Sequence, residues 1–121
     1  MKNIIYVLAL FMGIASSAQQ IKKIEPPYWW SGMTLDQMDL IEVNEAFAIQ
    51  VLANEKVLKW DREKLNVHGG AIALGHPTGI SGARIIVSLY YAMKGLDKSF
   101  GIASICGGGG VSMATVIKRE S

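Results

Sequence analysis

The sequence predicts an α/β domain with two helices and a mixed sheet that ends in a hairpin. Three observations point to this class. Apolar residues recur at helical spacing in two stretches, β-rich runs lie before and after them, and glycines occupy the turns between. About 50% of the 121 residues are hydrophobic, which is enough for one core and one domain at most. The expected order of elements is β-α-β-α-β-β.

The first elements of this order follow Gly32. The stretch from Thr34 to Gln37 has the residues of a capping box and predicts a short helical turn. The apolar run at 40–43 then predicts a brief buried strand that delivers Asn44. From Glu45 to about Trp60, apolar residues recur at helical spacing, so we expect the first helix there.

The later elements alternate with glycine-rich turns. Residues 66–67 predict a short strand that leads into such a turn. A second helix is expected at about 79–94, with Gly95 as its C-terminal stop. Its apolar residues occupy more than one face, which predicts burial on several sides. The β-rich runs at 100–105 and 111–117, joined by four glycines, predict the final hairpin.

The N-terminus differs in character from the rest of the chain. Lys2 precedes an apolar run at 4–14, and small residues follow up to Ala18. This pattern is typical of a secretory signal peptide, so we assign residues 1–18 to a signal peptide that directs export to a periplasmic or extracellular location. A buried N-terminal strand or helix is the alternative. The run is too short for a stable membrane span.

Charge and cysteine content exclude several classes of partner. The formal net charge is +2, and no basic run is longer than the pairs Lys22-Lys23 and Lys118-Arg119, so nucleic-acid binding has little support. A single Cys cannot form an internal disulfide. One Cys with two His is also too few for a structural zinc site, so we expect no metal.

Three motifs carry the candidate chemistry. They read NEAF at residues 44–47, GGAIALGHPTGISGAR at residues 69–84 and CGGGG at residues 106–110. Each has an ordinary structural explanation when it is taken alone. An Asn ahead of a helix is commonly an N-cap, a His between Gly and Pro a turn residue, and a lone Cys a buried apolar residue.

In this order and at this spacing, the motifs resemble the C-terminal catalytic part of the thiolases, the acetyl-CoA acetyltransferases, over residues 33–120. The resemblance implies a partial thiolase-like domain over residues 34–121. It also implies an acyltransferase that joins two acetyl-CoA molecules into acetoacetyl-CoA and CoA, or runs the reverse thiolysis. Coenzyme A thioesters would be the substrates, with no tightly bound cofactor. A cytoplasmic origin and a homo-oligomer follow from the same resemblance.

The resemblance gives catalytic roles to His76 and Cys106. His76 would activate the family's nucleophilic Cys and help to form an oxyanion hole. Imidazole suits both tasks because it titrates near neutral pH and can donate a hydrogen bond to developing negative charge. Cys106 would be the acid/base residue that removes the α-proton of an acetyl thioester. Such a step needs a group that both accepts and returns a proton.

Further roles in substrate binding follow from the same resemblance. Asn44 would hold a water in the first oxyanion hole, and the backbone N–H of Gly108 would be a donor of the second. Glycines suit the latter role because they leave backbone N–H groups open to an anion. Ala46 and Phe47 would line the pantetheine channel, although apolar packing explains these two residues equally well.

One part of the family's machinery is missing from this sequence. Thiolases form their acyl-enzyme on a separate Cys, whereas Cys106 is the single Cys here. A nucleophile and its base act as a unit, so the loss of one member costs many orders of magnitude in rate. We therefore expect that the isolated chain is not a competent thiolase.

Residues 19–33 resemble a different class of protein, the opening of exported amylase-type glycosidases. Pro26 and Pro27 force an extended backbone, and Trp29 and Trp30 could stack on a sugar or pack against a strand. An exported, non-enzymatic glycan-binding remnant is therefore an alternative function. Because coenzyme A is an intracellular carrier, the two resemblances conflict. We hypothesise a fusion near residues 32–33.

A second alternative is a hydrolase. Asn44, His76 and Cys106 are the ingredients of a Cys–His–Asn hydrolase of papain type. However, the chain order is reversed, and the local cues of that family are absent.

Overall fold

The computed structural model describes residues 31–109 and 111–120. Three strands form one mixed sheet in the order β1 (Leu40–Val43), β2 (Phe100–Gly108) and β3 (Val111–Lys118). This sheet confirms the predicted α/β class, the mixed strand directions and the final hairpin. The predicted signal peptide and the tryptophans at 29 and 30 lie outside the described residues.

The strand directions place two chain segments at one edge of the sheet. β1 runs parallel to β2, with register from Leu40 opposite Gly101 to Val43 opposite Ser104. β2 and β3 are antiparallel, and their register is interrupted by a bulge between Cys106 and Gly108. Because β1 and β2 are parallel, their carboxyl ends emerge side by side. The segment that begins at Asn44 therefore leaves the sheet near the end of β2 that carries Cys106.

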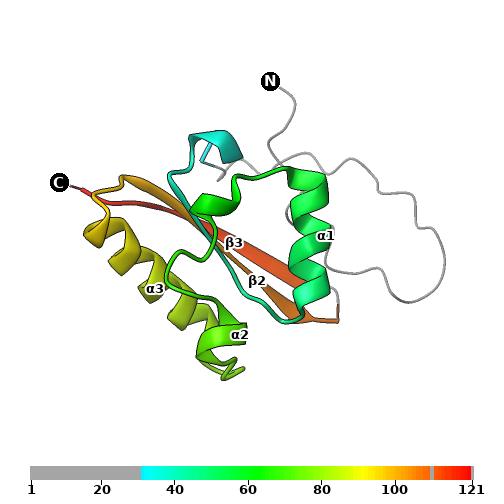
Figure 1. The fold of residues 1–121 in the computed structure, drawn as a ribbon. Coiled ribbons are helices and arrows are strands. Elements are labelled where there is room, and N and C mark those ends of the chain that lie inside the picture. Colours follow the sequence, from blue (N-terminus) through cyan, green and yellow to red (C-terminus); the bar gives the residue numbers. More distant parts are fainter. Residues whose placement is uncertain (1–30, 110, 121) are drawn as a thin grey trace.

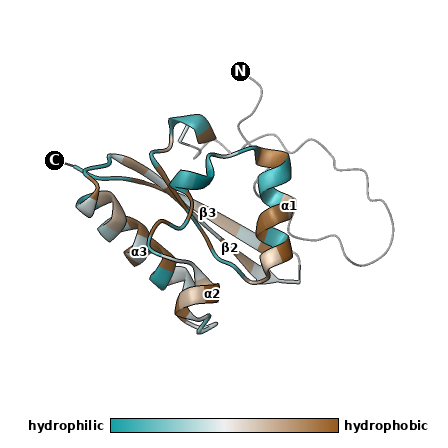
Figure 2. Ribbon diagram, in the orientation of Figure 1, coloured by the Kyte–Doolittle hydropathy of each residue, from teal (hydrophilic) through white to brown (hydrophobic). Residues whose placement is uncertain are grey.

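Helices lie on both sides of the sheet, as Figure 1 shows for α1 (Ala48–Leu58) and α3 (Ser81–Gly95). Successive residues of a strand point to opposite faces, so each face has its own core. The core beneath α3 consists of Leu40, Ile85, Leu89, Ala92, Met93 and Ala103. The core on the α1 side consists of Met38, Ile41, Val43, Val51 and Trp60. Figure 2 shows how hydrophobic and hydrophilic residues are distributed over these elements.

Two short 3-10 turns flank β1 and α1 in the described residues. The predicted helical turn forms as η1 (Leu35–Gln37), where the backbone N–H of Thr34 donates to Gln37 Oε1 at 2.7 Å. A further turn, η2 (Arg62–Lys64), follows α1 and is capped by Asp61, whose carboxylate accepts from the Glu63 N–H. None of the helices in residues 31–109 and 111–120 is long and apolar enough to cross a membrane.

The first helix is shorter than the sequence predicts. It begins at Ala48 instead of Glu45, because strand pairing continues to Asn44, whose N–H donates to Ser104 O at 2.9 Å, and the backbone of Phe47 is still extended with φ of −146°. It ends at Leu58 instead of Trp60, because Lys59 adopts a left-handed conformation with φ of 52°.

The predicted strand at 66–67 is wrong. The backbone contributes only an isolated bridge between Ile41 and Leu65, and Asn66 turns the chain with φ of 45°. The Asn66 side chain takes the place of a strand residue, since its Oδ1 accepts from the Val43 N–H at 2.8 Å and its Nδ2 donates to Val43 O at 3.0 Å. The observed order is therefore β-α-α-α-β-β, with α2 (Ala71–Leu74) in the stretch predicted to be a turn.

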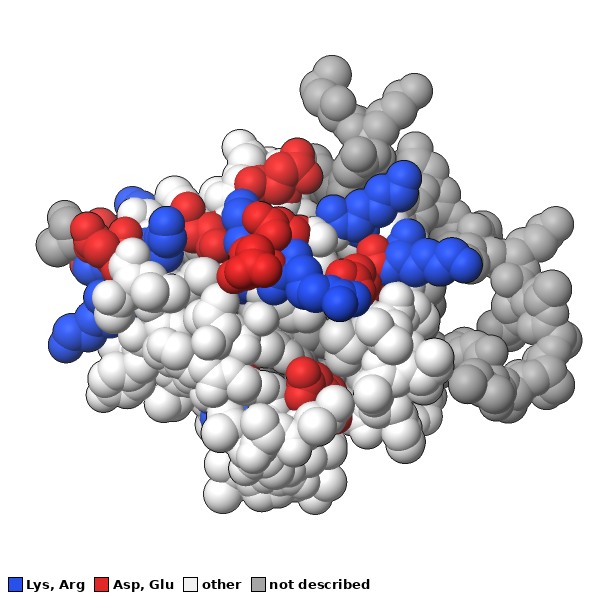
Figure 3. Space-filling view, in the orientation of Figure 1, with Lys and Arg blue, Asp and Glu red and all other residues white. Residues whose placement is uncertain are grey.

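The second predicted helix forms as α3 but is buried on one face only. Leu89 and Met93 are 1% and 0% exposed, whereas Val87 and Tyr91 are 53% and 59% exposed. Burial on several sides is thus wrong for the described residues, because the sheet covers α3 from a single direction. Figure 3 shows that charged side chains gather in a band along the upper part of the view, while the lower part, over α2 and α3, carries few.

Candidate active site

The His76 imidazole is held in one orientation at the start of α3. Its Nδ1 lies 2.6 Å from Ser81 Oγ, and Ser81 Oγ lies 3.0 Å from the carbonyl oxygen of Pro77. A carbonyl oxygen only accepts, so the single hydroxyl proton of Ser81 is directed to Pro77. Ser81 Oγ must then accept from His76 Nδ1–H. These partners place a proton on Nδ1, so the neutral imidazole that fits them is the tautomer in which Nε2 carries a lone pair.

Asn44 meets that lone pair from the end of β1. Its Nδ2 lies 3.4 Å from His76 Nε2, and the residue is fully buried. An amide nitrogen can only donate, so the contact fits the tautomer that Ser81 imposes. Asn44 is not an N-cap, because the N-cap of α1 is Phe47. The structure therefore brings together two of the predicted site residues, Asn44 and His76, although they lie 32 positions apart.

Cys106 lies near the carboxyl end of β2 as a half-buried free thiol, opposite Ser112 of β3. No hydrogen bond joins it to His76 or Asn44 in the described part of the chain. The bulge after Cys106 leads to Gly108, whose φ of 75° is favourable for glycine alone. Within residues 31–109 and 111–120, no three His, Cys, Asp or Glu side chains are grouped so that they could hold a metal ion.

The two predicted channel residues lie just before α1. Phe47 is 71% exposed and so packs into neither core of the described chain. Ala46 is half-buried in the same loop. Packing into these cores therefore does not explain the apolar character of Phe47, and its ring is free to contact a ligand or another part of a protein.

Three polar residues of this region were not predicted from the sequence as parts of the site. They are Ser81, Glu45 and Asn66. The Glu45 carboxylate accepts from the Ile72 N–H at 2.8 Å and from Asn66 Nδ2 at 3.2 Å. Ser81 has a sequence signal, because it lies five residues after His76 in the GHPTGIS segment. Glu45 lies in the NEAF motif next to Asn44, whereas Asn66 has no such signal, since its contacts join residues far apart in the chain.

A buried ion pair lies behind the site. Glu42 of β1 is 1% exposed, and its Oε1 is 3.9 Å from Arg84 Nη1 of α3. Burial raises the pKa of the Glu42 carboxyl to about 7; Arg84 opposes the shift and Glu45 adds to it. At this distance the pair is not hydrogen-bonded, and all three guanidinium nitrogens of Arg84 are buried without a partner in the described residues.

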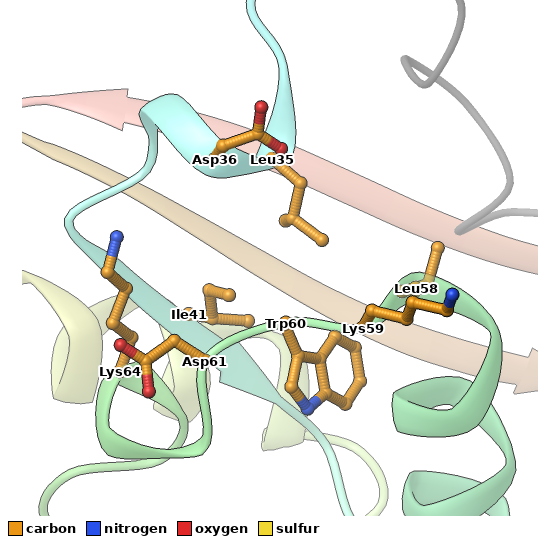
Figure 4. A pocket seen from close by; sticks show the side chains of 8 residues that line it. All are labelled: Leu35, Asp36, Ile41, Leu58, Lys59, Trp60, Asp61 and Lys64. Carbon is orange, nitrogen blue, oxygen red and sulfur yellow. The ribbon is translucent and has the colours of Figure 1, made fainter.

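A separate hollow of about 320 Å³ lies on the α1 side of the sheet (Figure 4). It is lined by Leu35, Asp36, Ile41, Leu58, Lys59, Trp60, Asp61 and Lys64. None of the predicted site residues is among them. Its acidic and basic side chains are mixed, so the hollow favours neither an anion nor a cation.

A buried Asn and a half-buried Cys at the ends of parallel strands, with an exposed His that the Asn contacts, have the composition of an acid/base site in an α/β protein. Within that class, the chain belongs to the thiolase family, because it matches "Thiolase, C-terminal domain" over residues 12–119. The match begins at residue 12, inside the segment predicted to be a signal peptide. The resemblance inferred from the three motifs is thereby confirmed.

Curated relatives agree with this family. The acetyl-CoA acetyltransferase of Escherichia coli is 58% identical over 89 residues, which are 74% of this chain and 23% of the relative. The mitochondrial acetyl-CoA acetyltransferase of Rattus norvegicus is 51% identical over 90 residues, which are 74% of this chain and 21% of the relative. The chain thus spans less than a quarter of the length of these relatives.

Solved structures agree on the fold. The Bacillus anthracis acetyl-CoA acetyltransferase superposes with a TM-score of 0.69 at 53% identity, covering 70% of this chain and 22% of that one. Human mitochondrial 3-ketoacyl-CoA thiolase in complex with CoA gives a TM-score of 0.72 at 48% identity, covering 74% and 23%. These similarities confirm the thiolase-like α/β fold that the motifs predicted.

Proposed function

We propose that this chain carries the acid/base part of a thiolase active site and acts on coenzyme A thioesters. The complete reaction joins two acetyl-CoA molecules into acetoacetyl-CoA and CoA, or runs in reverse as thiolysis. The observation that carries the proposal is the hydrogen-bonded series Asn44–His76–Ser81, which presents an imidazole with a defined lone pair. Relatives named acetyl-CoA acetyltransferases and a CoA-bound thiolase structure support the choice of substrate.

His76 and Asn44 form the base and oxyanion side of the proposed site. The Nε2 lone pair of His76 can take a proton from a thiol, and the resulting Nε2–H can donate to developing negative charge. The Asn44 amide holds the Nε2 position and, by the resemblance to the family, a water beside it. Both functions depend on the tautomer that Ser81 imposes through Nδ1.

Cys106 performs the proton transfer on the substrate. As a thiolate, its Sγ accepts a proton from the methyl carbon of acetyl-CoA, and the C–H electron pair moves into a carbon–carbon double bond. The thioester oxygen then carries negative charge, which N–H donors such as that of Gly108 stabilise. The enolate is the carbon nucleophile for the acyl group that the family holds on a second Cys. With Cys106 as its single Cys, the chain alone stops at the enolate.

The experiment that tests this function is deuterium exchange into the methyl group of acetyl-CoA, measured by mass spectrometry with the purified chain. Exchange requires only the proton-transfer step, so it should occur without the second Cys. It should be lost in Cys106→Ala and His76→Ala and kept in Ser88→Ala, a control at a half-buried position further along α3. No exchange above the level without protein would overturn the proposal. Cleavage of acetoacetyl-CoA by the chain alone would overturn the predicted lack of turnover.

A second part of the proposal concerns residues 1–33. We infer a signal peptide at 1–18 and an extended glycosidase-like segment at 19–33, joined to the thiolase-like domain at Gly32–Met33. A sequencing read of the source DNA across these two codons should be continuous if the fusion is real. In an exporting bacterium, the mature protein should then begin at Gln19 by mass spectrometry. If no continuous read crosses these codons, the thiolase-like part belongs to another gene.

A further inference from the structure

We propose that Glu45 is a positioning residue, which fastens the segment carrying His76 to the end of β1 so that Asn44 and His76 meet. The inference rests on the proposed function, because the position of His76 matters for activity only if His76 acts on coenzyme A thioesters. The carboxylate lies next to Asn44 in the sequence and reaches into the loop that leads to His76. The Glu45 side chain, the Asn66 side chain and the Ile72 N–H together are called the latch below.

The latch joins three segments of the chain through two hydrogen bonds to one carboxylate. Glu45 Oε2 accepts from the Ile72 N–H at 2.8 Å, and Oε1 accepts from Asn66 Nδ2 at 3.2 Å. Ile72 is the second residue of the four-residue α2, so its N–H has no acceptor within the helix. Charge-assisted bonds of this kind are about twice as strong as neutral ones.

Asn66 connects the latch to the strand that carries Asn44. Its side-chain amide makes both backbone hydrogen bonds of Val43, the residue before Asn44. The second proton of Asn66 Nδ2 is then free for Glu45 Oε1. The Glu45 carboxylate therefore links two places in the chain. Through Asn66 it is connected to the backbone of Val43, next to Asn44, and directly it binds Ile72 of α2, four residues before His76.

Gly70 shows how closely the carboxylate is enclosed. A Cβ at Gly70 would overlap the carboxyl group of Glu45 and lie 2.6 Å from Asn66 Nδ2. The backbone at Gly70 is extended, so the absent side chain leaves room for the latch and serves no conformational need. This spatial requirement explains a glycine in the motif that neither turn geometry nor the His76 chemistry explains.

The first test needs no variant. Amide hydrogen exchange by NMR on the unmodified chain should show the Ile72 N–H exchanging at least about tenfold more slowly than in an unfolded chain. Only the bond to Glu45 can protect this amide within a helix so short. Exchange of Ile72 at the unfolded rate would overturn the latch.

The second test asks whether the latch positions His76. In Glu45→Gln, a single amide oxygen replaces two carboxylate oxygens, so the Ile72 or Asn66 bond is lost. The ¹⁵N shifts of the His76 ring should change from a single tautomer to a mixture, and methyl-proton exchange of acetyl-CoA should fall about tenfold at unchanged thioester affinity. The matched control, Glu55→Gln, removes the exposed carboxylate that pairs with Arg62 and should change neither signal.

A third comparison tests the latch with a different substitution, in case Glu45→Gln does not fold. Gly70→Ala should reproduce the loss of Ile72 protection by displacing the carboxylate, and it should do so less in a Glu45→Ala background. An unchanged His76 tautomer in folded Glu45→Gln would overturn the positioning role. Absent methyl-proton exchange with a single His76 tautomer in the unmodified chain would instead overturn the proposed function and leave the latch standing.

Discussion

At the scale of single residues, the state of His76 depends on Ser81. Ser81 is fully buried, and its hydroxyl can satisfy Nδ1 only as an acceptor, because its own proton goes to Pro77 O. The imidazole of His76 is itself exposed, so water competes at every other position of the ring. A buried hydroxyl is therefore the feature that selects the tautomer with the lone pair directed to Asn44.

Ser81→Ala should release this selection. We expect the ¹⁵N shifts of the His76 ring to report a mixture of tautomers, with a loss of about 1 kcal/mol in the free energy of unfolding. Ser88→Ala, on the same helix and remote from His76, is the control and should leave the tautomer unchanged. A single Nδ1-protonated tautomer in Ser81→Ala would show that Asn44 alone is sufficient.

Glu42 makes the stability of the fold depend on pH. Burial raises its pKa to about 7 in the folded chain from an ordinary value of 4.5, so the folded state keeps a proton that the unfolded chain loses in this interval. Stability should therefore fall as pH rises from about 4.5 to about 7 and then level off. Glu42→Gln should remove that fall, which amounts to about 3 kcal/mol.

Urea unfolding at pH 5 and at pH 8 measures this difference, with each variant compared with the parent at the same pH. Glu55→Gln is the control, because its hydrogen bond with Arg62 lowers the pKa of Glu55 and moves its titration below this interval. Equal pH dependence in Glu42→Gln and the parent would mean that Glu42 ionises normally and that water reaches it.

At the scale of elements, two glycines near α3 should respond in opposite directions. A Cβ at Gly101 of β2 would lie 2.7 Å from Met93 Sδ and 2.8 Å from Leu89 Cδ1, both in a closed core. Gly101→Ala should therefore destabilise the fold by roughly 1–3 kcal/mol through overpacking. Gly82, inside α3, has nothing within 4 Å of a Cβ, so Gly82→Ala should stabilise by roughly 0.5–1 kcal/mol.

Thermal or urea unfolding of both variants checks the contrast. A Leu89→Ala background supplies the space that an alanine at 101 needs, so the cost of Gly101→Ala should shrink there. Equal effects of the two substitutions would show that α3 does not pack on β2 as described.

The same elements show what the sequence could and could not predict. The apolar run at 40–43, the helix at α3 and the glycine-linked hairpin follow from local periodicity, and all three form. The predicted strand at 66–67 does not form, because the Asn66 side chain makes the two hydrogen bonds to Val43 that a neighbouring strand would make. No local sequence pattern reveals such a contact. α2 was missed because a four-residue helix fixed by Glu45 has too few residues for a periodic signal.

The site residues likewise fall into those that the sequence predicted and those that only the structure shows. The candidacy of Asn44, His76 and Cys106 came from motif resemblance, and the structure places Asn44 Nδ2 at 3.4 Å from His76 Nε2. Ser81, Glu45 and Asn66 act through contacts that depend on the folded chain, so their residue types alone do not single them out. Periodicity gives the elements of this fold, while the polar contacts between its loops require coordinates.

At the scale of the whole molecule, the uncovered face of α3 determines how the chain behaves in solution. Exposed apolar residues of α3 include Ile86, Val87, Tyr90 and Tyr91. Figure 3 shows few charges in the lower part of the view, over α2 and α3. The chain spans 21–23% of the length of the relatives reported above, and nothing in residues 31–109 and 111–120 covers this face. Apolar patches of this kind favour association with other surfaces.

We therefore expect the purified chain to self-associate or aggregate as its concentration rises, measured by sedimentation velocity. Replacing Val87 and Tyr91 together by Lys places two charges one helical turn apart on this face and should shift the chain toward monomer. Ala53→Lys with Val57→Lys adds the same charge at the same spacing on α1 and should have a smaller effect. A monodisperse monomer with a cooperative melt in the unmodified chain would contradict the expectation. Such a result would mean that the sheet and one face of α3 are a sufficient core, and that a thiolase-like C-terminal domain of this size is an independent folding unit.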